Sequence, residues 1–168
     1  MKNKMKTLSR IILLIAFLFN SGGKIFGQDK VNLSLGIGWT EVINLGIKYQ
    51  ILNQAQIGLN FGWYPETEAN GWLLSIQGNF YYHFFGKSKF SDLHPWYGRI
   101  GLNYLRDDFW GSGSVNWWYS HLRFGRDIYF SNKLGISLDA GLYYHLNPDI
   151  TGNLKFGPSM GACFFYRF

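Results

Sequence analysis

GPSMGACFFYRF, residues 157–168, alternates between two kinds of side chain along most of its length. Every second residue counted back from the end is apolar or aromatic: Phe168, Tyr166, Phe164, Ala162 and Met160. The residues between them are smaller or more polar, with the exception of Phe165. Because successive side chains of a β-strand point to opposite faces, this period of two predicts a strand with one apolar and one polar face.

The same period recurs in seven earlier segments, which are separated by residues typical of turns. These segments span residues 31–39, 42–51, 55–64, 72–85, 96–107, 116–130 and 134–146. After residue 27 no segment keeps the i, i+3, i+4 apolar spacing of an amphipathic helix. The sequence therefore predicts a single all-β domain of eight strands over residues 28–168.

The composition is rich in aromatic residues and poor in charge for a soluble protein of 168 residues. Aromatic residues make up 20% of the chain, and its formal net charge is +6. Five of the 16 Lys and Arg residues lie in residues 1–27, which contain no acid, so the remainder has 11 basic against 10 acidic residues. This near balance argues against nucleic acid as a partner.

The first 27 residues have the pattern of a signal peptide. A basic start, MKNKMKTLSR, precedes nine uninterrupted apolar residues at positions 11–19, and small residues follow. The apolar run is shorter than the roughly 20 residues that a transmembrane helix requires. We expect cleavage between Gly23 and Gln28; an uncleaved anchor is the alternative.

The distribution of aromatic and small residues predicts that the apolar faces point outward. Each apolar face carries aromatic residues near both of its ends, as the two interfaces of a membrane barrel require. The opposite faces collect Gly, Asn, Gln and Ser, which suit a narrow polar interior. An open sheet would leave unpaired backbone groups in lipid, whereas eight strands can close. We therefore expect a closed, up-and-down, antiparallel, eight-stranded transmembrane β-barrel.

The last strand resembles the C-terminal strand of Gram-negative outer-membrane β-barrels. Those strands end in Phe, with Tyr or another apolar residue two positions earlier, as Phe164, Tyr166 and Phe168 do. The pattern of residues 28–168 is similar to small barrels of the OmpA-barrel and OmpX type. The resemblance implies an outer-membrane location, contact with outer-membrane lipid, and insertion by the barrel-assembly machinery, which reads the last strand.

An even number of strands places the first and last residues of the barrel on the same side of the membrane. The resemblance implies that this side is the periplasm. The turns near Asn53, 86–95 and 131–133 then share that side, although 86–95 is long for such a turn. Arg126 falls on the outward face of its strand. It either lies near the interface and reaches out of the hydrocarbon, or a bulge at Gly125 shifts the local register.

Charged side chains on the inward faces predict a network of ions inside the barrel. If residues 116–130 and 134–146 pair through the turn at 131–133, paired residue numbers sum to about 264. Asp139 then lies diagonally across from both Arg123 and Asp127. We expect Arg99, Arg123, Asp127 and Asp139 to form a network that fills the lumen; a path for protons or ions is the alternative.

Other candidate sites are weaker. Tyr119, His121, Tyr143 and His145 fall on the inward face near the outer mouth and suggest a ligand site, but two His without a third ligand predict no metal centre. Phe109 and Trp110, in a Gly/Ser loop, either contact a partner or rest on the membrane interface. The single Cys163 lies on the inward face and cannot form an internal disulfide.

These observations favour a non-enzymatic outer-membrane barrel with a filled polar lumen and a structural, accessory or surface-interaction role, including a possible protein partner in the envelope. No cofactor and no catalytic residue is expected. One alternative is a lipid A-modifying enzyme; the deacylase family has His-x-Ser on a strand, and none of the four His has Ser two residues later. The other alternative is a secreted, soluble, lipocalin-like binding barrel.

Overall fold

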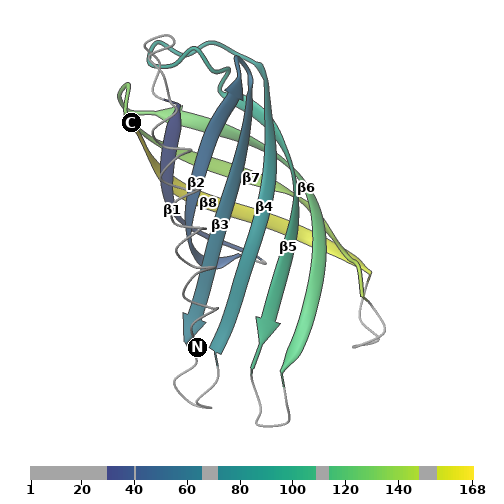
Figure 1. Cartoon of the computed structure of the whole chain (residues 1–168). Coiled ribbons are helices and arrows are strands. Elements are labelled where there is room, and N and C mark those ends of the chain that lie inside the picture. Colours follow the sequence, from purple (N-terminus) through teal and green to yellow (C-terminus); the bar gives the residue numbers. More distant parts are fainter. Residues whose placement is uncertain (1–29, 40, 66–71, 109–113, 148–154) are drawn as a thin grey trace, which may run out of the picture.

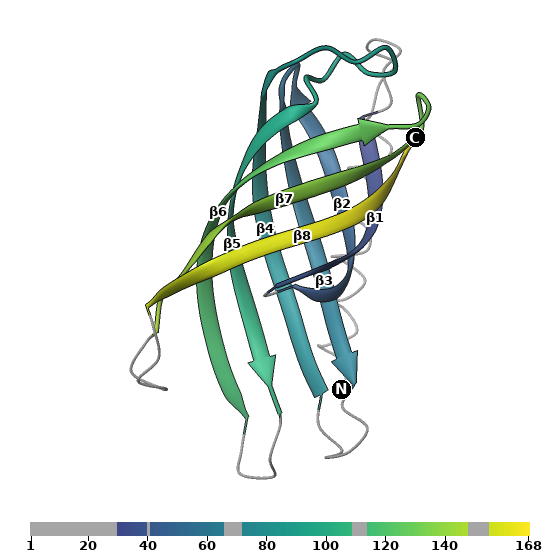
Figure 2. The same cartoon turned by 180° about the vertical axis from the view of Figure 1, so that it is seen from behind.

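The computed structural model describes residues 30–39, 41–65, 72–108, 114–147 and 155–168, and these form one closed barrel (Figure 1, Figure 2). Its eight strands follow the chain in order: β1 (Val31–Gly38), β2 (Val42–Leu52), β3 (Ala55–Pro65), β4 (Trp72–Phe85), β5 (Trp96–Asp107), β6 (Val115–Tyr129), β7 (Leu134–His145) and β8 (Phe156–Arg167). The expected fold class is confirmed, and the expected strand ends agree to within one residue. None of the described residues forms a helix long and apolar enough to cross a membrane.

Every strand pairs antiparallel with its neighbours in sequence, and β8 pairs with β1 to close the sheet. Leu35 of β1 is opposite Phe164 of β8 at this closure. In the β6–β7 hairpin, Arg123 is opposite Gly141 and Asp127 is opposite Ser137, so the predicted register is confirmed. Closure pairs the backbone of both end strands and leaves no free sheet edge in the described barrel.

The outward face is apolar and the inward face is polar. Leu59 is 61% exposed and Phe164 is 64% exposed, whereas Arg123 on the inward face is fully buried. The exposed large apolar residues occur on all eight strands, and most of the buried side chains are Asn, Gln, Ser, His, Lys or Arg. This is the orientation predicted from the distribution of aromatic and small residues, and it is the reverse of the arrangement in a soluble barrel.

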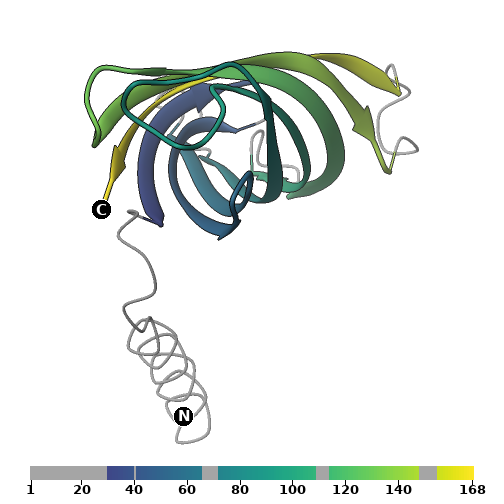
Figure 3. The same cartoon turned by 90° about the horizontal axis from the view of Figure 1, so that it is seen from above.

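The two ends of the barrel differ. The turn end holds the β2–β3 turn, the β6–β7 turn, the end of β8 and the connection 86–95; the opposite end, here called the loop end, holds the last residues of β3, β5 and β7 (Figure 1). The connection 86–95, here called the cap, extends across part of the opening at the turn end (Figure 3). Its Leu93 is only 2% exposed.

Hydrogen bonds from three elements hold the cap in place. Gln54, in the β2–β3 turn, accepts from the His94 backbone at 2.9 Å. His83 of β4 donates from Nδ1 to the His94 carbonyl at 2.7 Å, and Arg167 of β8 donates to Ser91 Oγ at 2.8 Å. The unusual length of this connection is therefore explained by its position over the lumen.

Two adjacent phenylalanines of β8 test the orientation. Phe165 points inward and is 3% exposed, and its ring packs against that of Tyr129 with 5.4 Å between the ring centroids. Phe164 points outward. We expect Phe165→Ala to lower the free energy of unfolding by about 3–5 kcal/mol, because it leaves a cavity in a packed interior. Phe164→Ala should cost about 1 kcal/mol or less. Urea unfolding in detergent micelles measures both, and equal losses would contradict this orientation.

Candidate functional site

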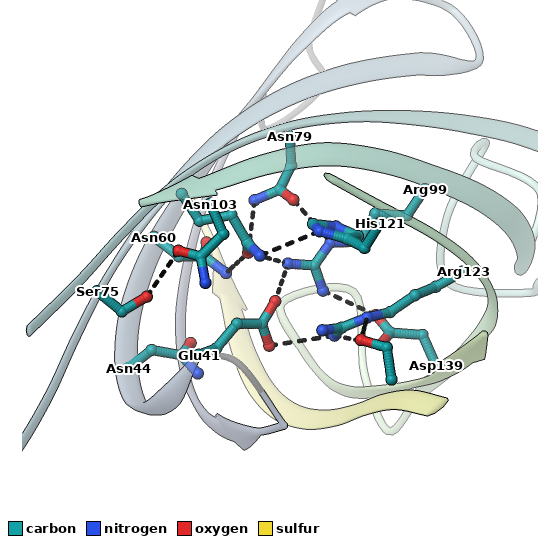
Figure 4. Close-up of polar contacts among 12 residues, drawn as sticks. Glu41, Asn44, Asn60, Ser75, Asn79, Arg99, Asn103, His121, Arg123 and Asp139 are labelled. Atoms are coloured by element: carbon teal, nitrogen blue, oxygen red, sulfur yellow. Dashed lines mark hydrogen bonds and ion pairs between the residues drawn. The ribbon is translucent and has the colours of Figure 1, made fainter. Parts of the chain in front are cut away.

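Four charged side chains meet inside the barrel: Arg99 of β5, Arg123 of β6, Asp139 of β7 and Glu41 (Figure 4). Asp139 accepts from Arg99 Nη1 and from Arg123 Nη1, each at 3.0 Å. Glu41 accepts from Arg123 Nη1 at 3.2 Å and from Arg99 Nη2. Two guanidinium groups thus share two carboxylates, which leaves this buried ion cluster without net charge.

The other nitrogen atoms of the two guanidinium groups also donate hydrogen bonds. Arg99 Nε donates to Asn79 Oδ1 at 2.9 Å, and Arg99 Nη2 also donates to Gln77. Arg123 donates to Ser159 Oγ at 2.7 Å and to the Trp39 carbonyl oxygen at 3.0 Å. A buried charge is tolerated only when it is paired and hydrogen-bonded, and this cluster meets both conditions.

Glu41 is the member of the cluster that the sequence did not predict. It lies in the connection between β1 and β2, outside every segment with period-two spacing, so alternation says nothing about its direction. β1 has only eight residues, and its connection to β2 lies well short of the ends of β3 and β5 (Figure 2). Val42 has a positive φ of 54°, which is rare for a β-branched residue. At this turn the Glu41 side chain points into the barrel and is only 3% exposed.

Glycine residues around Glu41 make its inward position possible. A Cβ atom added to Gly62 of β3 would overlap the Glu41 carbonyl oxygen, and one added to Gly38 would overlap its carboxylate. A larger residue at either position would push the β1–β2 connection outward. Part of the Gly-rich character of the inward faces is therefore required by the placement of one glutamate.

Amide side chains form a layer beside the ion cluster and fix the state of His121. The Gln77 carbonyl oxygen accepts from Arg99, which can only donate, and from Asn79 Nδ2 at 3.1 Å. The Gln77 nitrogen therefore donates to His121 Nδ1, 3.3 Å away. His121 consequently accepts at Nδ1, and its Nε2 is buried without a hydrogen-bond partner among the described residues.

Asp127 lies outside the ion cluster, contrary to the prediction. Ser137 Oγ donates to its carboxylate at 2.6 Å, and Tyr129 OH donates at 3.2 Å. Lys48 Nζ donates to the same Ser137 at 3.3 Å and lies 4.6 Å from the centre of the Tyr81 ring. Asp127 thus belongs to a second polar group closer to the turn end. The predicted register placed Asp139 diagonally across from both Arg123 and Asp127. Asp139 contacts Arg123 because the two side chains have opposite charges, whereas Asp127 has the same charge as Asp139.

The expected lumen-mouth residues separate into two levels. One level is an aromatic cluster formed by Trp117, Tyr119, Tyr143 and His145. In this cluster the His145 ring lies edge-on to two others, with 4.7 Å between its centroid and that of Tyr119 and 5.0 Å to that of Trp117. His121 lies deeper, in the amide layer. Within the described residues, no group of three or more His, Cys, Asp or Glu is placed to hold a metal ion.

The structure places the aromatic residues of the last strand and the histidines, but it does not describe the other predicted sites. Phe164, Tyr166 and Phe168 all face outward, and the rings of Tyr166 and Phe168 pack at 4.8 Å. Phe109, Trp110 and residues 1–27 lie outside the described residues. The hydrogen bonds found for the histidines in the described ranges go to amide side chains or backbone carbonyls, with no serine or carboxylate among them.

Little empty space remains around the ion cluster. A cavity of about 10 Å³ lies between Glu41, Lys48, Tyr81 and Arg99. This volume is about the minimum for one water molecule. Charged and amide side chains thus occupy this part of the lumen.

We expect Glu41→Gln to destabilise the barrel by about 3–5 kcal/mol, because two buried guanidinium groups would then share one carboxylate. The matched control is Asp108→Asn, which removes a partly exposed ion pair to Arg106 at 3.5 Å and should cost less than about 1 kcal/mol. Urea unfolding in micelles measures the difference. Equal stability of Glu41→Gln and the unchanged protein would show that the cluster contributes little.

A pair of glycine substitutions tests the packing around Glu41. Gly62→Ala should destabilise the barrel by about 1–3 kcal/mol, because the new methyl group meets backbone rather than a movable side chain. Gly78 of β4 has no atom within 4 Å of an added Cβ, so Gly78→Ala should be neutral or slightly stabilising. Thermal unfolding of the two variants provides the comparison, and a similar loss in both would argue against a specific role for Gly62.

The fold occurs in solved structures, whereas no family model and no curated protein sequence matches the chain. The N-terminal β-barrel domain of Pseudomonas aeruginosa OprF is 18% identical, with a TM-score of 0.61 over 85% of this chain and 100% of that one. Neisserial surface protein A is 12% identical, with a TM-score of 0.48 over 83% of this chain and 95% of that one. The chain therefore has the closed eight-stranded barrel fold of the OprF domain.

Proposed function

We propose that this protein is an outer-membrane β-barrel whose lumen is filled and which acts as a structural, accessory or surface-interaction component of the cell envelope. The observation that carries the proposal is that large apolar side chains cover the outer face of all eight strands. In water such a surface would be an aggregation hazard, since soluble monomers rarely expose apolar patches larger than a few hundred Å². Hydrocarbon is the environment that matches it.

The position of the aromatic residues supports a membrane location. Trp63, Trp72 and Trp118 lie towards the loop end of their strands, and Phe84 and Trp96 lie at the turn end. Amphipathic rings concentrate at the two interfaces of a bilayer. The apolar band between these two sets of rings is the part that would span the hydrocarbon.

Two features support a lumen that does not conduct. The ion cluster lies inside it, and the cap extends across part of the opening at the turn end. An eight-stranded barrel is only wide enough for its own side chains, so a water-filled channel would require these groups to move. A structural or surface-interaction role fits this interior better than transport does.

Export and insertion complete the proposal. Residues 1–27 would direct export as a cleaved signal peptide, and the outward-facing Phe164, Tyr166 and Phe168 would present the last strand to the barrel-assembly machinery. No observation among the described residues favours a lipid A-modifying enzyme, because no histidine there bonds to a serine or a carboxylate. The outward apolar face argues against a soluble, lipocalin-like barrel.

Membrane integration and conductance can be measured separately. We expect the protein to remain in the membrane fraction after carbonate extraction and to migrate differently on gels before and after heating, because a closed barrel resists unfolding by detergent. In planar lipid bilayers it should give no unitary conductance steps. Release by carbonate would contradict the membrane location, and stable conductance steps would contradict the filled lumen.

A further inference from the structure

Arg126 is a charged side chain on the apolar outer face of β6. It pairs with Trp96 of β5 and Leu138 of β7 in unbroken register, which excludes the expected alternative of a bulge at Gly125. The next outward residues along its strand are Phe124, 59% exposed, and Ile128, 41% exposed. An arginine between such neighbours requires a partner that the strand itself does not provide.

Arg126 lies near the rim of the barrel at the turn end. Its partner Trp96 is the first residue of β5, and Trp96 in turn pairs with Phe85, the last residue of β4. All three residues are thus level with the point where the cap begins. This is the height at which the hydrocarbon of a bilayer would meet its headgroups.

The guanidinium of Arg126 is positioned by an aromatic ring but has no anion. It lies over Trp96, 5.3 Å from the ring centroid, and no carboxylate in the described ranges is within ion-pair distance. Arg106 at the loop end provides a contrast: it lies 5.3 Å from the centre of Trp72 and pairs with Asp108 at 3.5 Å. The protein supplies an anion to one of these two cation–aromatic pairs and leaves the other open.

The surroundings of Arg126 are positively charged. Gly86 packs against Trp96, since a Cβ added there would lie 3.4 Å from Cδ1, and the exposed Lys87 follows it in the cap. Lys133, at the same end, lies 5.9 Å from the centre of the Tyr166 ring. Asp92 is the one acidic residue that the structure describes at the turn end outside the lumen. The missing partner is therefore an anion.

We propose that Arg126 and Trp96, with Lys87 of the adjoining cap, bind the phosphate of an anionic phospholipid in the leaflet at the turn end. A guanidinium group can donate two parallel hydrogen bonds to one phosphate, and an indole ring favours the interface between headgroups and acyl chains. Clustered cations attract anionic lipid over zwitterionic lipid. This inference depends on the proposed membrane location.

The test is native mass spectrometry of the protein released from nanodiscs of an equal mixture of phosphatidylglycerol and phosphatidylcholine. The unchanged protein should retain phosphatidylglycerol preferentially, and Arg126→Met should lower this preference by about five-fold. Met suits an outward apolar face, so the variant should fold, as heat-dependent gel mobility checks. Arg126→Lys should keep much of the preference, and Arg106→Met is the matched control that should keep all of it.

Each outcome separates the inference from the proposal on which it rests. A protein that does not incorporate into nanodiscs would overturn the membrane location itself. A protein that incorporates but retains both lipids equally would overturn the lipid site alone and would leave Arg126 hydrated at the interface. An equal loss of preference in Arg126→Met and Arg106→Met would also overturn the site, because it would indicate a general effect of charge.

Discussion

A closed sheet of eight strands encloses a space only as wide as its own side chains, and this limit governs the rest of the structure. Charges inside such a space are cut off from water and must be neutralised by one another. Arg99 and Arg123 meet this condition with Asp139 and Glu41. Lys48, nearer the turn end, is linked to the carboxylate of Asp127 through the hydroxyl of Ser137.

The same limit determines what lies outside. The lumen holds only a few large apolar or aromatic side chains, such as Phe165, and the others occupy the outer face of every strand. The barrel then requires an apolar surrounding, which a bilayer provides. Its two ends meet that surrounding differently: an outward arginine is paired with Asp108 at the loop end, and an equivalent arginine is left unpaired at the turn end.

The sequence predicted those features that depend on alternation. Period two gave the strands, and the short β6–β7 turn gave the register that places Asp139 near Arg123. Alternation gives no information about the direction of side chains outside the strands. Glu41 enters the lumen from the connection after the short β1, and the cap is held across part of the opening by bonds with Gln54, His83 and Arg167; neither connection has a periodic signal. Asp127 was assigned to the wrong group because register alone gives Asp139 two possible neighbours.

The most direct test of the account is to measure which side chains contact lipid. In protein with isotope-labelled leucine methyl groups, reconstituted in lipid nanodiscs, nuclear Overhauser effects report contact between methyl and acyl-chain protons. We expect such contacts for Leu59, Leu102 and Leu138, and none for Leu93, a buried residue of the cap. Contacts of Leu59, Leu102 and Leu138 with water in place of acyl chains would contradict it.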